Sequence, residues 1–242
     1  MPRYRQVQVS FGPPLTPMVR YIIVVTVAVF FLTYLPAEML GWSFPFRWFG
    51  LRPYDVTHRL FLWQPVTYLF LHAGFFHVIF NLFALWMFGS DLERTWGPRR
   101  FLYYFFLTGI GAGVLCVLLE PSGVIPTVGN SGAIYGVLLA YGLLFPERPI
   151  LLWLLIPVKA KWFVLIMGLI EFVATRSASG SGVSHIAHLG GMLFGFLYLR
   201  GGSLPWRLRL RYHEWRRARL RRKFEVYTRK HEGKDDAGRW IH

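Results

Sequence analysis

Six long apolar stretches set the main constraint on how this chain folds. They cover about residues 20–40, 74–90, 100–119, 131–146, 158–175 and 184–200. An α-helix needs about 20 largely apolar residues to cross the core of a bilayer, and these stretches have or approach that length. The strict alternation of polar and apolar residues that is typical of a β-barrel is absent. We therefore expect an all-α membrane protein, a bundle of six transmembrane helices.

The composition excludes several other classes of protein. Only 16% of the residues are charged and 54% are hydrophobic, whereas an average soluble domain carries roughly 25% charge. The same values exclude an intrinsically disordered chain, and a single cysteine, Cys116, excludes a disulfide scaffold. The first apolar stretch is too long for a cleaved signal peptide and lacks a small-residue cleavage site, so we expect a retained span.

The basic residues predict the orientation of the bundle. Six spans place both termini on one side, and taking that side as cytoplasmic puts ten basic residues of the first 200 inside and four outside, which favours N-in and C-in. We expect residues 1–17 to form a cytoplasmic N-terminal segment, residues 18–200 the six-helix domain, and residues 201–242 a basic cytoplasmic tail of a multi-pass protein of the cell membrane. The inside residues are Arg3, Arg5, Arg20, Arg94, Arg99, Arg100, Arg148, Lys159, Lys161 and Arg200, and the outside ones are Arg47, Arg52, Arg59 and Arg176.

The tail carries much of the net charge of +15. Its alternating aromatic, leucine and arginine residues fit either a surface helix that binds anionic lipid or a solvated segment that enforces topology. We expect no binding of nucleic acid, because no recognition motif accompanies the charge.

The fourth stretch is short for a transmembrane helix. From Ser131 to Phe145 it would extend roughly 22 Å, against a hydrocarbon core of about 30 Å. Ser131 should therefore lie below the outer surface of the membrane, and the loop at residues 120–130 should dip in to meet it. Such a loop is tolerated only where protein or a wet cavity surrounds it.

Four polar residues are predicted to share one depth in the outer half of the membrane. His77 and Asn81 open the second span four residues apart, Ser131 opens the fourth, and His188 lies one turn into the sixth. Two stripes of small residues predict that the fourth and sixth spans touch and bring Ser131 toward His188. The stripes are Gly132, Gly136 and Ala140 in the fourth span, and Gly191 and Gly195 in the sixth. A plainer interpretation is that the glycines only pack helices and the histidines bond one another.

A serine hydroxyl beside a neutral histidine suits nucleophilic catalysis. The imidazole accepts the hydroxyl proton and later returns it to a leaving amine. Free N–H groups at the start of the fourth helix would stabilise an oxyanion, with help from the side chains of Asn81 and His77.

Three motifs now carry a resemblance to a known family. They are His77-Val78-Ile79-Phe80-Asn81, Gly129-Asn130-Ser131-Gly132 and Ala187-His188-Leu189-Gly190-Gly191. In this order, in a six-span chain, they resemble the rhomboid intramembrane serine proteases over about residues 60–200.

The resemblance implies a role for each matching residue. Ser131 would be the nucleophile and His188 the general base of a dyad, with His77, Asn81 and the Ser131 amide as the oxyanion hole. Tyr135 would pack against the His188 ring, Gly129, Gly132 and Gly191 would permit close contacts, and His72 matches a further family histidine. The implied substrates are proteins that span or associate with the membrane, cleaved at helices that unwind easily, without cofactor or metal. The fifth span, with Trp162 and Phe172, would be a lateral gate.

One departure and several alternatives remain. Family members often have Trp-Arg in the first outer loop, where this chain has Trp63-Gln64. His185 is a rival base, and Glu171 is either a third member of a triad or a hydrogen-bonded group near the end of its span. A metal bound by His72, His77, His185 and His188 is a further alternative, although no zinc-protease motif occurs. A membrane adaptor or chaperone and a small-solute transporter are the competing functions.

Overall fold

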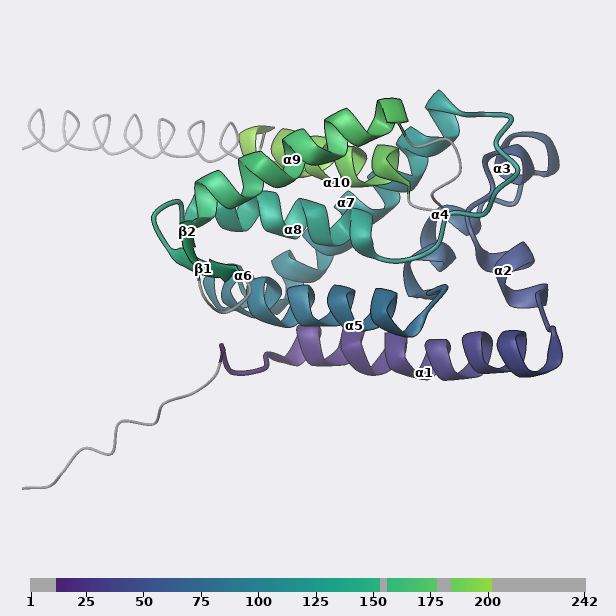
Figure 1. Ribbon diagram of the computed structural model, residues 1–242, viewed down its shortest axis with the longest axis horizontal. Helices are drawn as coiled ribbons and strands as arrows, with labels where there is room; N and C mark the ends of the chain where they lie inside the picture. Colours follow the sequence, from purple (N-terminus) through teal and green to yellow (C-terminus); the bar gives the residue numbers. More distant parts are fainter. Residues whose placement is uncertain (1–11, 153–155, 178–183, 202–242) are drawn as a thin grey trace, which may run out of the picture. The chain divides into compact units, whose positions relative to one another are not determined.

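The computed structural model describes residues 12–152, 156–177 and 184–201 (Figure 1). Most of the predicted N-terminal segment 1–17 and nearly all of the predicted tail 201–242 lie outside these residues. The elements in chain order are α1 (Pro17–Leu40), α2 (Phe44–Phe49), α3 (Pro53–Arg59), α4 (Gln64–Thr67), the 3₁₀ turn η1 (Tyr68–Phe70), α5 (Phe75–Ala84), the π-helical turn η2 (Leu85–Gly89), α6 (Ser90–Trp96), α7 (Pro98–Leu119), α8 (Ser131–Leu144), β1 (Pro149–Leu152), β2 (Ile156–Lys159), α9 (Ala160–Ser177) and α10 (His185–Gly201).

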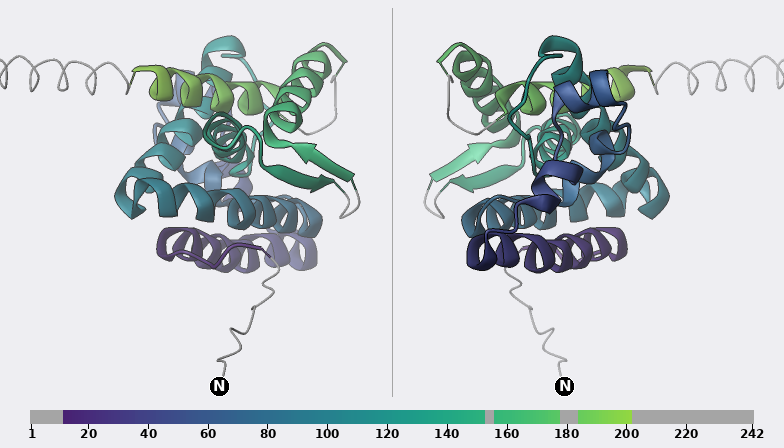
Figure 2. Two further views of the ribbon diagram at one scale, coloured as in Figure 1. Left: turned by 90° about the vertical axis from the view of Figure 1, so that its left-hand side faces the viewer. Right: turned by 90° about the vertical axis from the view of Figure 1, so that its right-hand side faces the viewer.

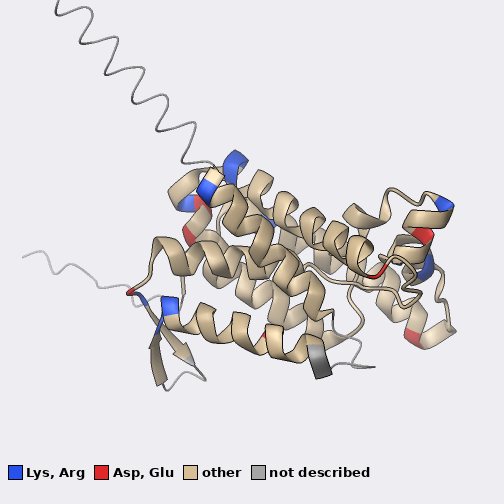
Figure 3. Ribbon diagram, turned by 90° about the horizontal axis from the view of Figure 1, so that it is seen from above, with Lys and Arg blue, Asp and Glu red and all other residues tan. Residues whose placement is uncertain are grey.

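Several of these helices are apolar enough for a membrane. Within the described ranges, α1, the continuous helix Phe75–Trp96 and α7 have the length and hydropathy to cross a bilayer, and α8 is apolar but shorter. Figure 3 shows that Lys, Arg, Asp and Glu lie mainly toward the two ends of the helices. The fold is therefore a membrane helical bundle, while the count of six spans and the N-in, C-in orientation stay predictions.

Helix α7 is the centre of the packing. It contacts α1, α3, α4, α6 and α8, and its glycines allow the close approach. A Cβ atom added to Gly109 would lie 2.7 Å from Leu69, and one added to Gly111 would lie 2.4 Å from Phe194 of α10. Helix α8 in turn contacts α5 and α9, and lies between them in Figure 1.

The hairpin of β1 and β2 is a correction to the expectation of helices alone. The two strands pair antiparallel from Pro149 with Lys159 to Leu152 with Ile156, and Figure 2 shows them extending away from the helices. The segment was expected to be a loop leading into a helix at residue 158. Its branched residues favour a strand, and Pro157 delays the helix until Ala160.

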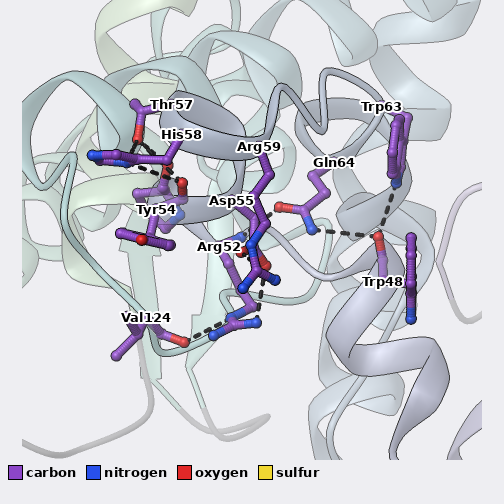
Figure 4. Close-up of polar contacts among 11 residues, drawn as sticks. Trp48, Arg52, Tyr54, Asp55, Thr57, His58, Arg59, Trp63, Gln64 and Val124 are labelled. Atoms are coloured by element: carbon purple, nitrogen blue, oxygen red, sulfur yellow. Dashed lines mark hydrogen bonds and ion pairs between the residues drawn. The ribbon is translucent and has the colours of Figure 1, made fainter.

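The connection between α1 and α5, residues 41–74, is fastened by buried polar groups (Figure 4). The Gln64 side chain is fully buried. Its Oε1 accepts the Arg52 N–H at 2.9 Å and its Nε2 donates to the Trp48 carbonyl at 3.3 Å, while the Trp63 indole donates to the same carbonyl at 2.9 Å. The Trp63-Gln64 pair therefore holds the connection together through hydrogen bonds of the indole and of the side-chain amide.

A guanidinium group in the same connection reaches the loop before α8. Arg52 donates from Nη1 to Asp55 Oδ2 at 2.9 Å and from Nε to the Val124 carbonyl at 2.9 Å. An isolated antiparallel bridge joins Leu51 to Thr127 through two backbone hydrogen bonds of 2.9 and 2.8 Å. The loop at residues 120–130 is thus bonded to the connection at Val124 and at Thr127.

Candidate active site

The start of α8 is shaped by the loop that precedes it. Gly129 has a φ of 110°, which side-chain-bearing residues rarely adopt, and its N–H donates to the Tyr68 carbonyl at 2.9 Å. Asn130 is fully buried and is the N-cap residue, so Ser131 is the first residue of the helix. The N–H groups of this first helical turn have no partner inside an α-helix, which suits them to bind negative charge.

Ser131 and His188 meet through a hydrogen bond. His188 Nε2 lies 2.8 Å from Ser131 Oγ, and the His188 side chain is buried. These residues are 57 positions apart and come from α8 and α10. The geometry allows the imidazole to accept the hydroxyl proton.

A close approach of α8 and α10 makes that contact possible. A Cβ atom added to Gly191 would lie 1.8 Å from the Gly132 carbonyl oxygen, so no larger residue fits there. The remainder of the two predicted stripes packs differently, since Gly136 faces Thr108 and Gly195 faces the Tyr104 hydroxyl, both on α7. The expected contact between the two stripes is thus limited to Gly132 and Gly191, because α7 lies against the later turns of both helices.

Tyr135 supports the histidine from one side. Its ring stacks on the His188 ring with centroids 4.3 Å apart and an interplanar angle of 13°. Tyr135 lies one helical turn after Ser131, so α8 supplies both the hydroxyl and the surface on which the imidazole rests.

His77 and Asn81 of α5 lie beside the loop that leads to Ser131. A Cβ atom on Gly129 would be 2.8 Å from His77 Nε2 and 3.7 Å from Asn81 Nδ2, so glycine leaves the room that both side chains occupy. Asn81 Nδ2 is buried and has no hydrogen-bond partner among the described residues. An unsatisfied buried donor is costly, and such a donor next to a serine hydroxyl is available to bind an anionic group.

His72 lies behind His77 in the same cluster. The side chain is fully buried, and its ring centroid is 5.0 Å from that of His77. His72 Nδ1 lies 3.4 Å from the Phe70 carbonyl, which connects the ring to the end of η1. The structure therefore gives His72 a place next to an oxyanion-hole candidate, with no described contact to Ser131.

Glu171 is the residue whose importance the sequence reasoning left open. It lies in α9 with 6% of its surface exposed, and its carboxylate accepts a short hydrogen bond from the Tyr135 hydroxyl. Glu171 Oε2 lies 2.6 Å from His185 Nδ1 and 2.9 Å from His188 Nδ1. A lone carboxylate in an apolar stretch was the available signal, because such a group needs partners.

The same three residues are the candidate metal ligands in the described part of the chain. One ligand atom each from Glu171, His185 and His188 lie within 4.8 Å of one another. Carboxylate and imidazole ligands are typical of zinc. His72 and His77 are not in this group, so the four-histidine alternative is not the set that the structure brings together.

The fold and this arrangement define a class of protein: a membrane helical bundle with a serine–histidine pair between two of its helices. A family model described as the Rhomboid domain matches residues 60–203. The chain belongs to the rhomboid family.

Individual relatives agree with that assignment. The chain is 34% identical over 144 residues to RHOMBOID-like protein 1 of Arabidopsis thaliana, covering 59% of this chain and 35% of the relative. It is 30% identical over 165 residues to Rhomboid protein 1, mitochondrial, of Saccharomyces cerevisiae, covering 65% and 47%. It is 32% identical over 162 residues to Rhomboid protease GluP of Bacillus subtilis, covering 65% and 29%. The chain thus matches less than half of the length of each of these relatives.

Proposed function

We propose that this protein is an intramembrane serine endopeptidase that cleaves transmembrane or membrane-associated proteins with a Ser131–His188 dyad. The observation that carries the proposal is the 2.8 Å contact between His188 Nε2 and Ser131 Oγ. Membership of a family that includes proteins named as proteases supports the reaction class. A serine hydroxyl becomes a strong nucleophile only when such a base accepts its proton.

The proposed reaction has two halves. Ser131 Oγ attacks the scissile carbonyl carbon while its proton moves to His188 Nε2, and the C–N bond then breaks as the imidazolium protonates the leaving amine. Water next gives a proton to His188, and its oxygen attacks the acyl-enzyme. Collapse of that intermediate returns the proton to Ser131 and releases the carboxylic acid.

The negative charge of each tetrahedral intermediate needs hydrogen-bond donors. The Ser131 N–H, the Asn81 amide and His77 are the proposed oxyanion hole, and Asn81 Nδ2 is a buried donor without a described partner. The N-terminal end of α8 adds the positive end of its helix dipole. Removing one such donor commonly costs about 100- to 1,000-fold in rate, so we expect Asn81→Ala to fall in that range.

The proposed setting is the cell membrane, with both termini cytoplasmic and residues 18–200 as the protease domain. Membrane-protein substrates would enter past α9, where Trp162 and Phe172 lie exposed on the surface of the bundle. Anionic lipid is the proposed partner of the basic tail, which is outside the described residues. The ten-to-four distribution of basic residues supports this orientation.

The activity is tested with a transmembrane reporter in proteoliposomes and a fluorophosphonate probe. Ser131→Ala and His188→Ala should abolish cleavage, and the probe should label Ser131 alone. Ser90→Ala, at a buried serine of α6, and His58→Ala, at an exposed histidine, are the matched controls and should remain active. Full cleavage by Ser131→Ala would overturn the proposal, and a retained cellular effect of that variant would favour an adaptor.

The pH dependence gives a second test of the histidine base. Cleavage should fall at acid pH, because an imidazolium cannot accept the serine proton. A rate that does not fall at acid pH would count against His188 as the base.

The orientation is tested by labelling single cysteines with a membrane-impermeant maleimide. Cys116 is the one native cysteine, so a Cys116→Ala background leaves only the introduced thiol. Cysteines at Lys159 and Arg59 should label from the cytoplasmic and the outer side, respectively. The reverse result would overturn the N-in, C-in proposal.

A further inference from the structure

We propose that Glu171 is a positioning residue that orients His188 as the general base, so that catalysis requires α9 to be seated against α8 and α10. The inference rests on the proposed function, because it assigns a partner to the proposed base. It extends the serine–histidine pair to a third group, contributed by a different helix.

The surroundings of Glu171 match an ionised carboxylate. Its two oxygens face the hydroxyl of Tyr135 and the Nδ1 atoms of His185 and His188. These come from α8 and α10, so two neighbouring helices direct three potential donors at one side chain of α9. A charged group inside an apolar bundle is retained only when it is paired in this way.

The position of Glu171 decides which nitrogen of His188 carries the proton. His188 Nε2 can accept the Ser131 proton only if the neutral ring holds its own proton on Nδ1. That nitrogen is 2.9 Å from Glu171 Oε2. A carboxylate accepts hydrogen bonds and does not donate them, so it stabilises the Nδ1–H form, which is the productive one.

The same carboxylate stabilises the ring after proton transfer. When the Ser131 O–H bond breaks and an N–H bond forms at Nε2, His188 becomes an imidazolium. Glu171 keeps its negative charge and takes no proton, while the positive charge develops next to it. This is the role of the acid in serine–histidine–acid triads.

The contact is not yet fully aligned. Oε2 makes its hydrogen bond to His185 Nδ1 at 2.6 Å, whereas His188 Nδ1 is near enough for an ion pair but lacks hydrogen-bond alignment. Catalytic hydrogen bonds are often loose before substrate binds and tighten in the complex. His185 therefore holds the carboxylate in place, and a small shift of α9 would transfer the bond to His188.

The attachment of α9 explains why its seating would matter. Its side chains Leu165, Leu169 and Phe172 point away from the protein, each more than half exposed. The buried residues of its described part are Ala160 and Val164 near its start, and Glu171 toward its other end. If α9 moves outward to admit a substrate, Glu171 leaves His188, and the base works again only when α9 returns.

A competing interpretation is that Glu171 merely holds α9 in place, with no effect on the base. Substitutions that change the charge and the shape of Glu171 separately distinguish these two interpretations. Glu171→Gln keeps the shape and can accept a hydrogen bond but loses the charge, whereas Glu171→Asp keeps the charge and shortens the side chain. A packing role predicts that Gln is tolerated better than Asp, and a positioning role predicts the opposite order.

The experiment measures kcat and KM on a transmembrane reporter, the rate of fluorophosphonate labelling of Ser131, and thermal unfolding. We expect Glu171→Gln to lower kcat about 10- to 1,000-fold with KM within about twofold, because general-base catalysis itself contributes about 100- to 10,000-fold. Glu171→Asp should keep more activity than Glu171→Gln. Glu120→Gln, at an exposed carboxylate after α7, is the matched control and should behave as wild type.

A spectroscopic measurement keeps the test decisive if a variant is inactive for other reasons. Nitrogen NMR of protein that carries isotope-labelled histidine should show the Nδ1–H form of His188 in the wild type. The His188 signals are assigned by their absence from the spectrum of His188→Ala. In Glu171→Gln it should show a mixture of both neutral forms, whereas Glu171→Asp, which keeps the charge, should keep the Nδ1–H form.

Two results would overturn the inference: kcat of Glu171→Gln within twofold of wild type, or an unchanged His188 spectrum. Either result could occur while Ser131→Ala is inactive. That combination would agree with the Ser131–His188 dyad and reject only the role proposed for Glu171. Full activity of Ser131→Ala would instead reject the proposed function itself.

Discussion

The α1–α5 connection and helix α9 both contact the proposed active site, but they are attached to the bundle in different ways. The connection is fixed by a buried amide and a partly buried guanidinium group that bond backbone atoms, and its Tyr68 carbonyl accepts the N–H of Gly129. Helix α9 turns most of its long apolar side chains outward and reaches the site through one carboxylate. The difference suggests a rigid side that builds the site and a side that can be displaced without dismantling it.

The largest expected effect lies in the rigid framework, at the crossing of α8 and α10. Gly191→Ala would bring a Cβ atom to 1.8 Å from the Gly132 carbonyl oxygen, so the helices must separate. We expect a loss of about 3 kcal/mol or more in the free energy of unfolding, at the upper end for overpacked cores, together with loss of cleavage. Thermal unfolding in detergent measures it.

The control for this substitution is in the same helix. Gly201→Ala adds a Cβ atom with nothing within 4 Å and should leave the unfolding temperature unchanged. Equal stability of Gly191→Ala and Gly201→Ala would show that the α8–α10 crossing is not rigid. It would contradict the proposed difference between a rigid side and a displaceable side of the site.

A second test removes a buried side chain whose hydrogen bonds hold the α1–α5 connection in place. Gln64→Leu deletes the acceptor of the Arg52 N–H and the donor to the Trp48 carbonyl. Leaving such groups unpaired costs about 1–3 kcal/mol, so the unfolding temperature should fall while kcat at low temperature stays within about twofold. Leu62→Gln, at an exposed neighbour, is the control. A stable Gln64→Leu protein with lost activity would instead place Gln64 in the chemistry.

A third test compares the two faces of α9 at adjacent residues. Val164 is buried, and a Cβ atom on Gly142 would lie 2.8 Å from it, whereas Leu165 is 60% exposed. We expect Val164→Ala to cost about 1–2 kcal/mol, as buried deletions do, and Leu165→Ala less than about 0.5 kcal/mol, as at surface sites. Unfolding measurements on both variants check this, and a larger loss in Leu165→Ala would reverse the assignment of the faces.

The sequence was sufficient for the positions of the helices and for the contact between Ser131 and His188. The apolar stretches predicted the positions of all the long helices to within a few residues, apart from the helix Phe75–Trp96, which continues past the expected end at residue 90. Counting residues inward from the outer side predicted one depth for His77, Asn81, Ser131 and His188, and the structure brings Ser131 and His188 into contact. Their order along the chain and the alternating direction of successive spans contain that information.

Other features depend on rotation and packing that the sequence does not encode locally. The Gly136 and Gly195 partners on α7 depend on how far each helix turns about its axis. The donors of Glu171 are 36 and 14–17 residues away, and no spacing rule relates α9 to α8 and α10. The hairpin of β1 and β2 was missed because its apolar residues resemble the end of a span.

The smallest expected effect is at the start of α9, where two exposed ion pairs of Glu147, with Lys159 and Lys161, add to its attachment. Hydrogen bonds from Lys159 and then Lys161 lower the pKa of Glu147 to about 2. Because the pKa is lowered by folding, the stabilisation is complete above the ordinary carboxyl pKa and is lost as the pH falls toward about 2. Exposed pairs contribute little and are screened by salt, so Glu147→Gln should lower the unfolding temperature only slightly at pH 7, and the difference from wild type should shrink below pH 4. A difference as large as that of Val164→Ala would mean that charge at its start, rather than packing along its buried face, holds α9 to the bundle.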